Sequence, residues 1–193
     1  MVLSLSSCGF CNILSKQFYY TGEGGVRPGK NKFELAKTPY LLKEQDLIKT
    51  NAIYQFCYSW NEKELIYQKT NCNHINAKIS FIRFFKNGRF LMNDLSTGKD
   101  SLEQYNNLKS GKIGYYKIEE KELILEYYSV SHAGMASDCG KYYKDKYKLT
   151  NNGIQLQAER RSNNGLFFGW TKVENAGWYL RKNIKGLEGV PSW

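Results

Sequence analysis

A succession of short strand patterns, joined by hairpin turns and without helical crossovers, most constrains the fold of this chain. From Ala52 onward we expect about eight to ten short strands. Parallel α/β folds need helical crossovers, so the pattern excludes them and favours an antiparallel meander. That many strands must hide their edges by closing into a barrel or by pairing two sheets. We therefore predict an all-β protein with an up-and-down barrel, and a two-sheet β-sandwich is the alternative.

The turns between these runs are specific. Asn87-Gly88 separates two aromatic-rich runs and is typical of a β-hairpin. A tight turn joins residues 114–118 to residues 122–130, and Asn151-Asn152-Gly153 joins the alternating run 141–149 to the next strand. Aromatic residues make up 15% of the chain, which also favours strands.

The organisation along the chain follows from these patterns. We assign residues 1–7 to the remnant of a lipoprotein signal peptide, 8–50 to a tether and extended arm, 51–183 to the barrel domain and 184–193 to a C-terminal tail. Within the arm, Phe33–Leu42 is predicted to be extended, because Pro39 restricts the residue before it. Residues 44–49 are predicted to form one helical turn, and 101–110 another.

The N-terminus carries a candidate membrane anchor. Leu5-Ser6-Ser7-Cys8 has the small residues that a lipoprotein signal peptidase requires before a cysteine that becomes lipidated. The basic and apolar parts of such a signal do not precede it, so we expect the start of the natural chain to lie upstream. A lipid on Cys8 would tether the protein to a bacterial membrane, since each buried CH₂ contributes about 0.8 kcal/mol.

The remaining cysteines suit an oxidising compartment. Cys57, Cys72 and Cys139 are candidates for a disulfide, with Cys72 bonded to either of the other two, and Cys11 is left in the tether. Cys72 and Cys139, together with His74 and His132, are also a possible tetrahedral zinc set, but their spacing fits no known zinc motif. We therefore expect no metal site.

The charge favours anionic partners. The net charge is +10, and from Lys141 onward ten basic and four acidic residues contribute +6 of it. Lys144, Lys146 and Lys148 share one face of their strand and form a basic face for anionic lipid or an anionic envelope component. An ordinary solvated strand face is the other interpretation. No nucleic-acid-binding motif accompanies the charge, so we expect no nucleic-acid partner.

The sequence offers little catalytic chemistry. Ser131, His132 and Asp138 lie together in a loop of small residues, and Glu119, Glu120 and Glu122 lie in and beside a turn. No P-loop, dinucleotide fingerprint or HExxH motif is present. We expect a protein that is not an enzyme and carries no cofactor.

The aromatic residues of the last strands are the better candidates for a binding site. An apolar cavity at a barrel mouth is how small barrels hold ligands, although the same side chains can simply fill the core. The candidate ligand-binding residues are Phe167, Phe168, Trp170, Trp178 and Tyr179.

Two stretches resemble lipocalin-like bacterial lipoproteins of the Bacteroidota type. They are Phe84-Phe-Lys-Asn-Gly-Arg-Phe90, an aromatic strand that ends in an Asn-Gly turn, and Gly114-Tyr-Tyr-Lys-Ile118 with Leu123-Ile-Leu125. The resemblance implies a lipocalin-like barrel that binds a small apolar or amphipathic ligand. It also implies a lipid-anchored place at the outer membrane, facing the periplasm, because no acidic residue follows Cys8 directly. We expect a monomer. The alternative is a non-catalytic structural or interaction protein of the cell envelope with a filled core.

Overall fold

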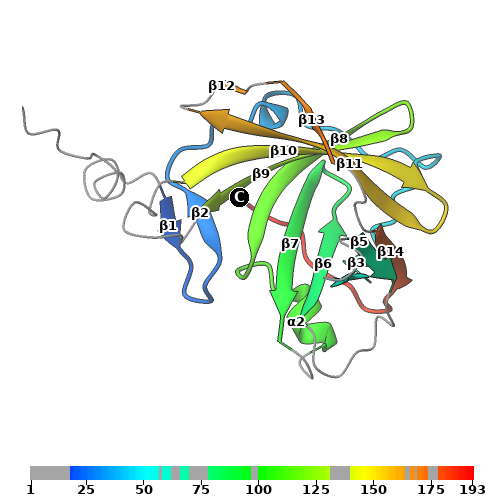
Figure 1. The fold of residues 1–193 in the computed structure, drawn as a ribbon. Helices are drawn as coiled ribbons and strands as arrows, with labels where there is room; N and C mark the ends of the chain where they lie inside the picture. Colours follow the sequence, from blue (N-terminus) through cyan, green and yellow to red (C-terminus); the bar gives the residue numbers. More distant parts are fainter. Residues whose placement is uncertain are drawn as a thin grey trace, which may run out of the picture.

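The computed structural model describes residues 18–56, 58–61, 66–69, 78–96, 100–130, 140–163, 166–167, 169–173 and 178–193. Eight of the described strands form a closed antiparallel β-barrel (Figure 1). They are β3 (Ala52–Phe56), β6 (Ile79–Phe84), β7 (Arg89–Leu95), β8 (Lys112–Glu119), β9 (Glu122–Val130), β10 (Gly140–Thr150), β11 (Gly153–Asn163) and β14 (Trp178–Asn183). Each strand pairs with the next along the chain, and β14 returns to pair with β3. The predicted up-and-down barrel is confirmed.

Shorter elements surround the barrel. A hairpin of β1 (Phe18–Tyr20) and β2 (Val26–Pro28) meets β8 in parallel, at Val26 and Lys112. The short strands β12 (Leu166–Phe167) and β13 (Thr171–Lys172) pair with β11, while β4 (Tyr58–Asn61) and β5 (Ile66–Lys69) form a separate ribbon. The helix α2 (Leu102–Asn106) occupies the predicted helical turn, and the Ser101 hydroxyl oxygen caps it by accepting the Gln104 N–H.

The turn chemistry explains two of the hairpins. Gly88 has a φ of 74°, which is in the left-handed region, and its backbone lies against Tyr40 so closely that a Cβ would collide with the Tyr40 carbonyl oxygen. Asn87 does not share the positive φ, so this turn is not the two-residue type I′ turn. Asn151 and Asn152 form a two-residue connection, with Thr150 paired to Gly153.

Aromatic and aliphatic side chains fill much of the barrel interior. The largest fully buried rings there are Tyr54, Phe84, Phe90, Tyr116 and Tyr147. Phe84 contacts Tyr54 and Tyr116 edge to face, with ring centroids 5.1 Å apart in both pairs. The Tyr116 hydroxyl donates to the Phe85 carbonyl at 2.7 Å, so this buried polar group is satisfied.

Residues 30–49 form an arm that crosses the outside of the barrel and then closes one of its ends. The predicted extended conformation of Phe33–Leu42 is wrong in part, since Leu35–Lys37 forms a 3₁₀ helix, η2. The physical reason is a tertiary contact at the start of η2, described below. The predicted helical turn at 44–49 is also wrong: residues 44 and 45 form only a turn.

The tail, residues 184–193, packs over the outer faces of β6, β7 and β8. The buried Arg83 guanidinium donates to the carbonyls of Tyr105 and Glu188, at 3.1 and 2.5 Å. Burial lowers the pKa of Arg83 to about 10. At the end of the tail, Trp193 packs against Phe85, with ring centroids 6.2 Å apart.

Candidate functional site

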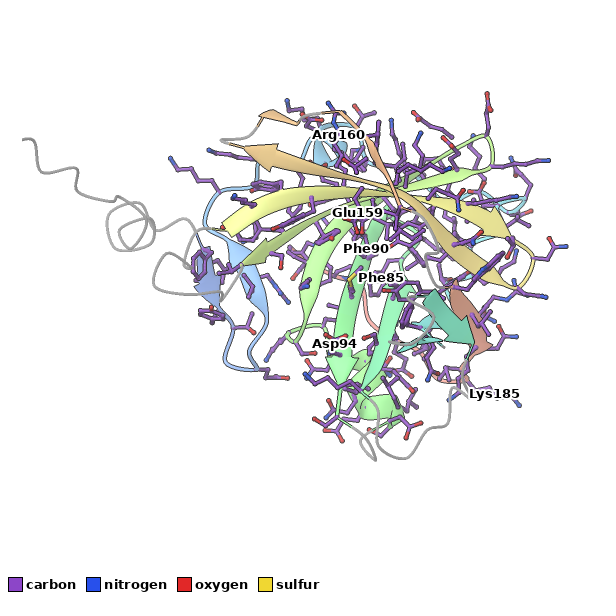
Figure 2. The ribbon with its side chains drawn as sticks, in the orientation of Figure 1. Phe85, Phe90, Asp94, Glu159, Arg160 and Lys185 are labelled. Carbon is purple, nitrogen blue, oxygen red and sulfur yellow. The ribbon has the colours of Figure 1, made fainter. Side chains whose placement is uncertain are left out.

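A groove with a volume of about 960 Å³ lies outside the barrel, between the arm and the strands beneath it. Its floor comprises outward-facing side chains of β8, β9 and β10, including the buried Ile124. Residues 34–43 of the arm form one wall, and Arg160 of β11 with Trp170 forms the other. Figure 2 shows Arg160 at the top of the view, outside the barrel, while its neighbour Glu159 lies on the inner side of the same strand. The groove is large enough for one small ligand.

One end of the arm is anchored by Phe33. Its ring is buried between Tyr115 and Tyr142, with centroid distances of 5.2 and 5.0 Å. The Tyr142 hydroxyl donates to the Lys30 carbonyl at 2.8 Å and accepts the Lys32 N–H at 3.2 Å. These contacts hold the start of the arm against β8 and β10.

The next contact of the arm is made by a buried carboxylate. Glu126 of β9 accepts the backbone N–H groups of Glu34 and Leu35, at 3.0 and 2.8 Å, just where η2 begins. Burial raises the pKa of Glu126, and the two backbone hydrogen bonds act against that rise. The carboxylate therefore satisfies backbone donors that an extended arm would point elsewhere, and this explains the 3₁₀ turn.

The far end of the arm closes one end of the barrel. Tyr40 and Leu42 pack against the interior cluster, and Ile48 is part of it. The Leu42 N–H donates to the Lys86 carbonyl at 3.0 Å, and the Tyr40 hydroxyl donates to Asp46 at 2.9 Å. Burial, assisted by Asp46, raises the pKa of Tyr40 to about 12. The arm is thus attached at both ends, with the groove beneath its middle.

Positive charge predominates in the groove. Two acidic side chains, Glu34 and Glu119, are among its lining residues. The cationic lining residues are Lys43, Lys117, Lys144, Lys146 and Arg160. A low-dielectric wall lined mostly by one sign of charge attracts the opposite sign, so this groove favours an anion.

Three of the four lysines that line the groove pair with carboxylates of the same molecule. Lys144 pairs with Glu34, Lys117 pairs with Glu119 at 2.5 Å, and Lys146 pairs with Glu122 at 3.0 Å. The Glu34 hydrogen bond to Lys144 lowers the pKa of Glu34, so its carboxylate is ionised at neutral pH. The side chain of Lys144 is 8% exposed and that of Glu34 is 49% exposed, so the anionic partner is the accessible one.

Apolar surface accompanies the charge. Leu41 is 70% exposed and Trp170 is 37% exposed, and both residues line the groove. Lys146 Nζ lies 5.1 Å from the centre of the Trp170 ring, and the Arg160 guanidinium lies 5.9 Å from it. Large apolar side chains exposed beside cations are typical of a surface that contacts an amphipathic molecule.

The barrel interior holds a polar group among its rings. Asp145 of β10 is 5% exposed, lies opposite Glu159 of β11, and accepts the Tyr147 hydroxyl at 3.2 Å. Burial, and to a lesser extent Glu159, raises the pKa of Asp145 to about 7.

The structure brings together residues that the sequence had assigned to two separate features. Lys144 and Lys146 from the predicted basic face and Trp170 from the predicted aromatic site all line the groove. Lys148 is exposed and is not among the lining residues described. Lys144 is not a solvated face residue, because the arm covers it.

The other predicted ligand residues lie elsewhere. Tyr179 points into the barrel, where its ring packs against Phe56 at 5.1 Å, and Trp178 precedes it on β14, half-buried. Phe167 is described only as part of β12. Residues outside the described part of the chain are Phe168, the lipidation candidate Cys8, the disulfide candidates Cys57, Cys72 and Cys139, and the loop residues Ser131, His132 and Asp138.

Sequence reasoning missed the contribution of the arm and of Lys117 and Arg160. Lys117 alternates with inward-facing residues of β8, so a period of two was available as a signal for its outward position. For Arg160, a period of two counted from Ile154 and Leu156 gives the inner face, and a register shift in the pairing of β11 with β10 turns Arg160 outward. Nothing in the local pattern indicated that the arm would cross the same face.

No protein-family model matches this chain, and it matches neither a curated protein nor a solved structure. Among the residues that the structure describes, no helix is long and apolar enough to cross a membrane. The groove lining described above contains no histidine or cysteine side chain.

Proposed function

We propose that this protein is a non-catalytic binding protein of the bacterial cell envelope, anchored by a lipid on Cys8, which holds a small amphipathic ligand. The single observation that carries the proposal is the groove under the arm, where lysines and exposed apolar side chains share one concave surface. The anchor rests on the lipobox-like Leu5-Ser6-Ser7-Cys8. Its place at the outer membrane, facing the periplasm, rests on the resemblance to lipocalin-like lipoproteins.

The ligand is assigned to the groove and not to the barrel interior. Buried rings such as Tyr116 and Tyr147 occupy the described barrel interior, so the groove offers more space for a ligand than the interior does. The same packing favours a second candidate, a structural or interaction protein of the envelope with a filled core. That candidate would use its basic surface to contact an anionic envelope component.

Native mass spectrometry of the protein, purified from a bacterial host without denaturation, tests the proposal. We expect extra mass that leaves on collisional activation, and less of it in Trp170→Ala. Tyr19→Ala is the matched control, because Tyr19 is an exposed aromatic residue of β1. A lipid mass that disappears in Cys8→Ser supports the anchor.

A bare polypeptide mass in the wild-type protein, with or without the lipid, would contradict ligand binding and favour the interaction protein. Equal ligand retention in Trp170→Ala and wild type would show that the ligand is bound somewhere other than the groove. Retention of the lipid mass in Cys8→Ser would contradict the anchor on that residue.

A further inference from the structure

We propose that the ligand of the groove is an amphipathic anion, a single molecule with a carboxylate or phosphate on an apolar body, and that its acidic group replaces the Glu34 carboxylate on Lys144. This inference rests on the proposed function, since it names the ligand class of the same groove. It also assigns Glu34 a role as an internal competitor for that ligand.

The burial of Lys144 is the first argument. The ammonium group of Lys144 lies under the arm, and Lys144 on β10 is paired with Glu126 on β9. The Glu126 carboxylate is buried and already accepts two backbone N–H groups, so it is committed to holding the arm. Glu34 is different, because its carboxylate is half exposed and belongs to the groove lining.

A ligand carboxylate or phosphate arriving from solvent can therefore make the same charge-assisted hydrogen bond that Glu34 makes. The exchange keeps the buried Lys144 ammonium group paired, because the acidic group of the ligand takes the place of the half-exposed Glu34 carboxylate, which returns to water. The backbone of Glu34 can stay bound to Glu126 while its side chain turns away. The arm then remains in place when the ligand binds.

The neighbouring cations extend the same site. Lys146 and Lys117 are partly exposed, and their partners Glu122 and Glu119 are more exposed than they are. Arg160 lies beside Trp170 on the opposite wall. An anion over Lys144 would thus meet cations from three strands and an excess of positive charge.

The apolar part of the ligand is assigned to Ile124, Leu41 and Trp170. All three line the groove, and the last two are exposed although they are large and apolar. The groove volume of about 960 Å³ suits one small molecule rather than the surface of a bilayer. We therefore infer that the groove holds a single amphiphile molecule.

Isothermal titration calorimetry of the full chain with three probes, each below its micelle concentration, tests the ligand class. Decyl phosphate carries both the anion and the apolar chain, decyl maltoside carries the chain alone, and inorganic phosphate carries the anion alone. We expect decyl phosphate to bind about tenfold or more tighter than decyl maltoside, and inorganic phosphate to bind weakest.

Three variants test the mechanism with decyl phosphate. Glu34→Gln keeps the shape of the side chain but removes the competing charge, so affinity should rise by about threefold to tenfold. Lys146→Gln should lower affinity by a similar factor. Lys185→Gln is the matched control with unchanged affinity, because Lys185 is exposed and lies at the lower right of Figure 2, far from Arg160.

The failure of this inference can be told apart from the failure of the proposed function. If decyl maltoside binds as tightly as decyl phosphate and Trp170→Ala weakens both, the groove binds ligands but the anion inference is wrong. An unchanged or lower affinity in Glu34→Gln overturns the competitor role. Phosphatidylglycerol vesicles are added as a fourth probe. Binding only to these vesicles, or to none of the probes, overturns the assignment of the ligand as a monomeric anion. Native mass spectrometry still tests separately whether the protein binds a ligand at all.

Discussion

The buried carboxyl group of Asp145 makes the stability of the barrel depend on pH. Asp145 faces the interior, is 5% exposed, and lies opposite Glu159. Burial, with a smaller contribution from Glu159, raises its pKa from 3.8 to about 7. Between these two values the folded protein keeps a proton on Asp145 that the unfolded chain has lost.

The sign and size follow from linkage. The unfolded chain binds fewer protons in this window, so the free energy of unfolding falls as pH rises, by about 1.4 kcal/mol per pH unit for one group. Over the window the loss approaches about 4 kcal/mol. Asp145→Asn removes this dependence, and its amide oxygen can still accept the Tyr147 hydroxyl. The variant should therefore be more stable than the wild type at about pH 8 and close to it at about pH 4.5.

Urea unfolding followed by circular dichroism at both pH values measures the effect. Asp94→Asn is the control, because Asp94 is an exposed carboxylate at the lower part of the barrel in Figure 2 and is bound by the Ser80 hydroxyl at 2.5 Å. This control makes the same chemical change at an exposed site. If the difference between Asp145→Asn and the wild type is the same at both pH values, the reasoning from burial is refuted.

Three further changes test the arm, the turn and the tail. Phe33→Ala empties a buried site between two tyrosines, and such a change lowers the free energy of unfolding by about 3–5 kcal/mol. Trypsin should then cut the arm faster, while the circular dichroism of the barrel stays the same. An unchanged cutting rate would contradict the role of Phe33 as an anchor of the arm. Gly88→Ala places a Cβ against the Tyr40 carbonyl at a positive φ and should lower the free energy of unfolding by more than about 1 kcal/mol. Gly169→Ala is the control and should not lower it, because a Cβ at Gly169 meets open space. Equal effects of the two changes would count against the turn geometry. Arg83→Gln removes the guanidinium that donates to the carbonyls of Tyr105 and Glu188, so the tail should loosen. Tryptophan fluorescence should then shift to longer wavelength. An unshifted spectrum would mean that Arg83 does not hold the tail.

The barrel could be predicted from the sequence because the patterns that indicate strands and hairpin turns are local. Strand alternation has a period of two, and turns such as Asn87-Gly88 and Asn151-Asn152-Gly153 act over a few residues. The alternation in β10 also separated its inward residues, such as Tyr147, from its outward lysines. The helical turn predicted within residues 101–110 is present as α2, and its cap, Ser101, lies directly before it.

The groove was decided only by tertiary structure. The 3₁₀ turn of the arm depends on Glu126, which is 92 residues from Glu34 along the chain, and no local propensity encodes that contact. Alternation placed Lys144 on the outer face but gave no information that the arm would cover it. Trp170 and Lys146 meet because β13, which follows Trp170, pairs with β11 beside β10, and the arm crosses the same face. Local periodicity thus determines which side of a strand a residue faces, whereas the packing of distant segments determines what meets it there.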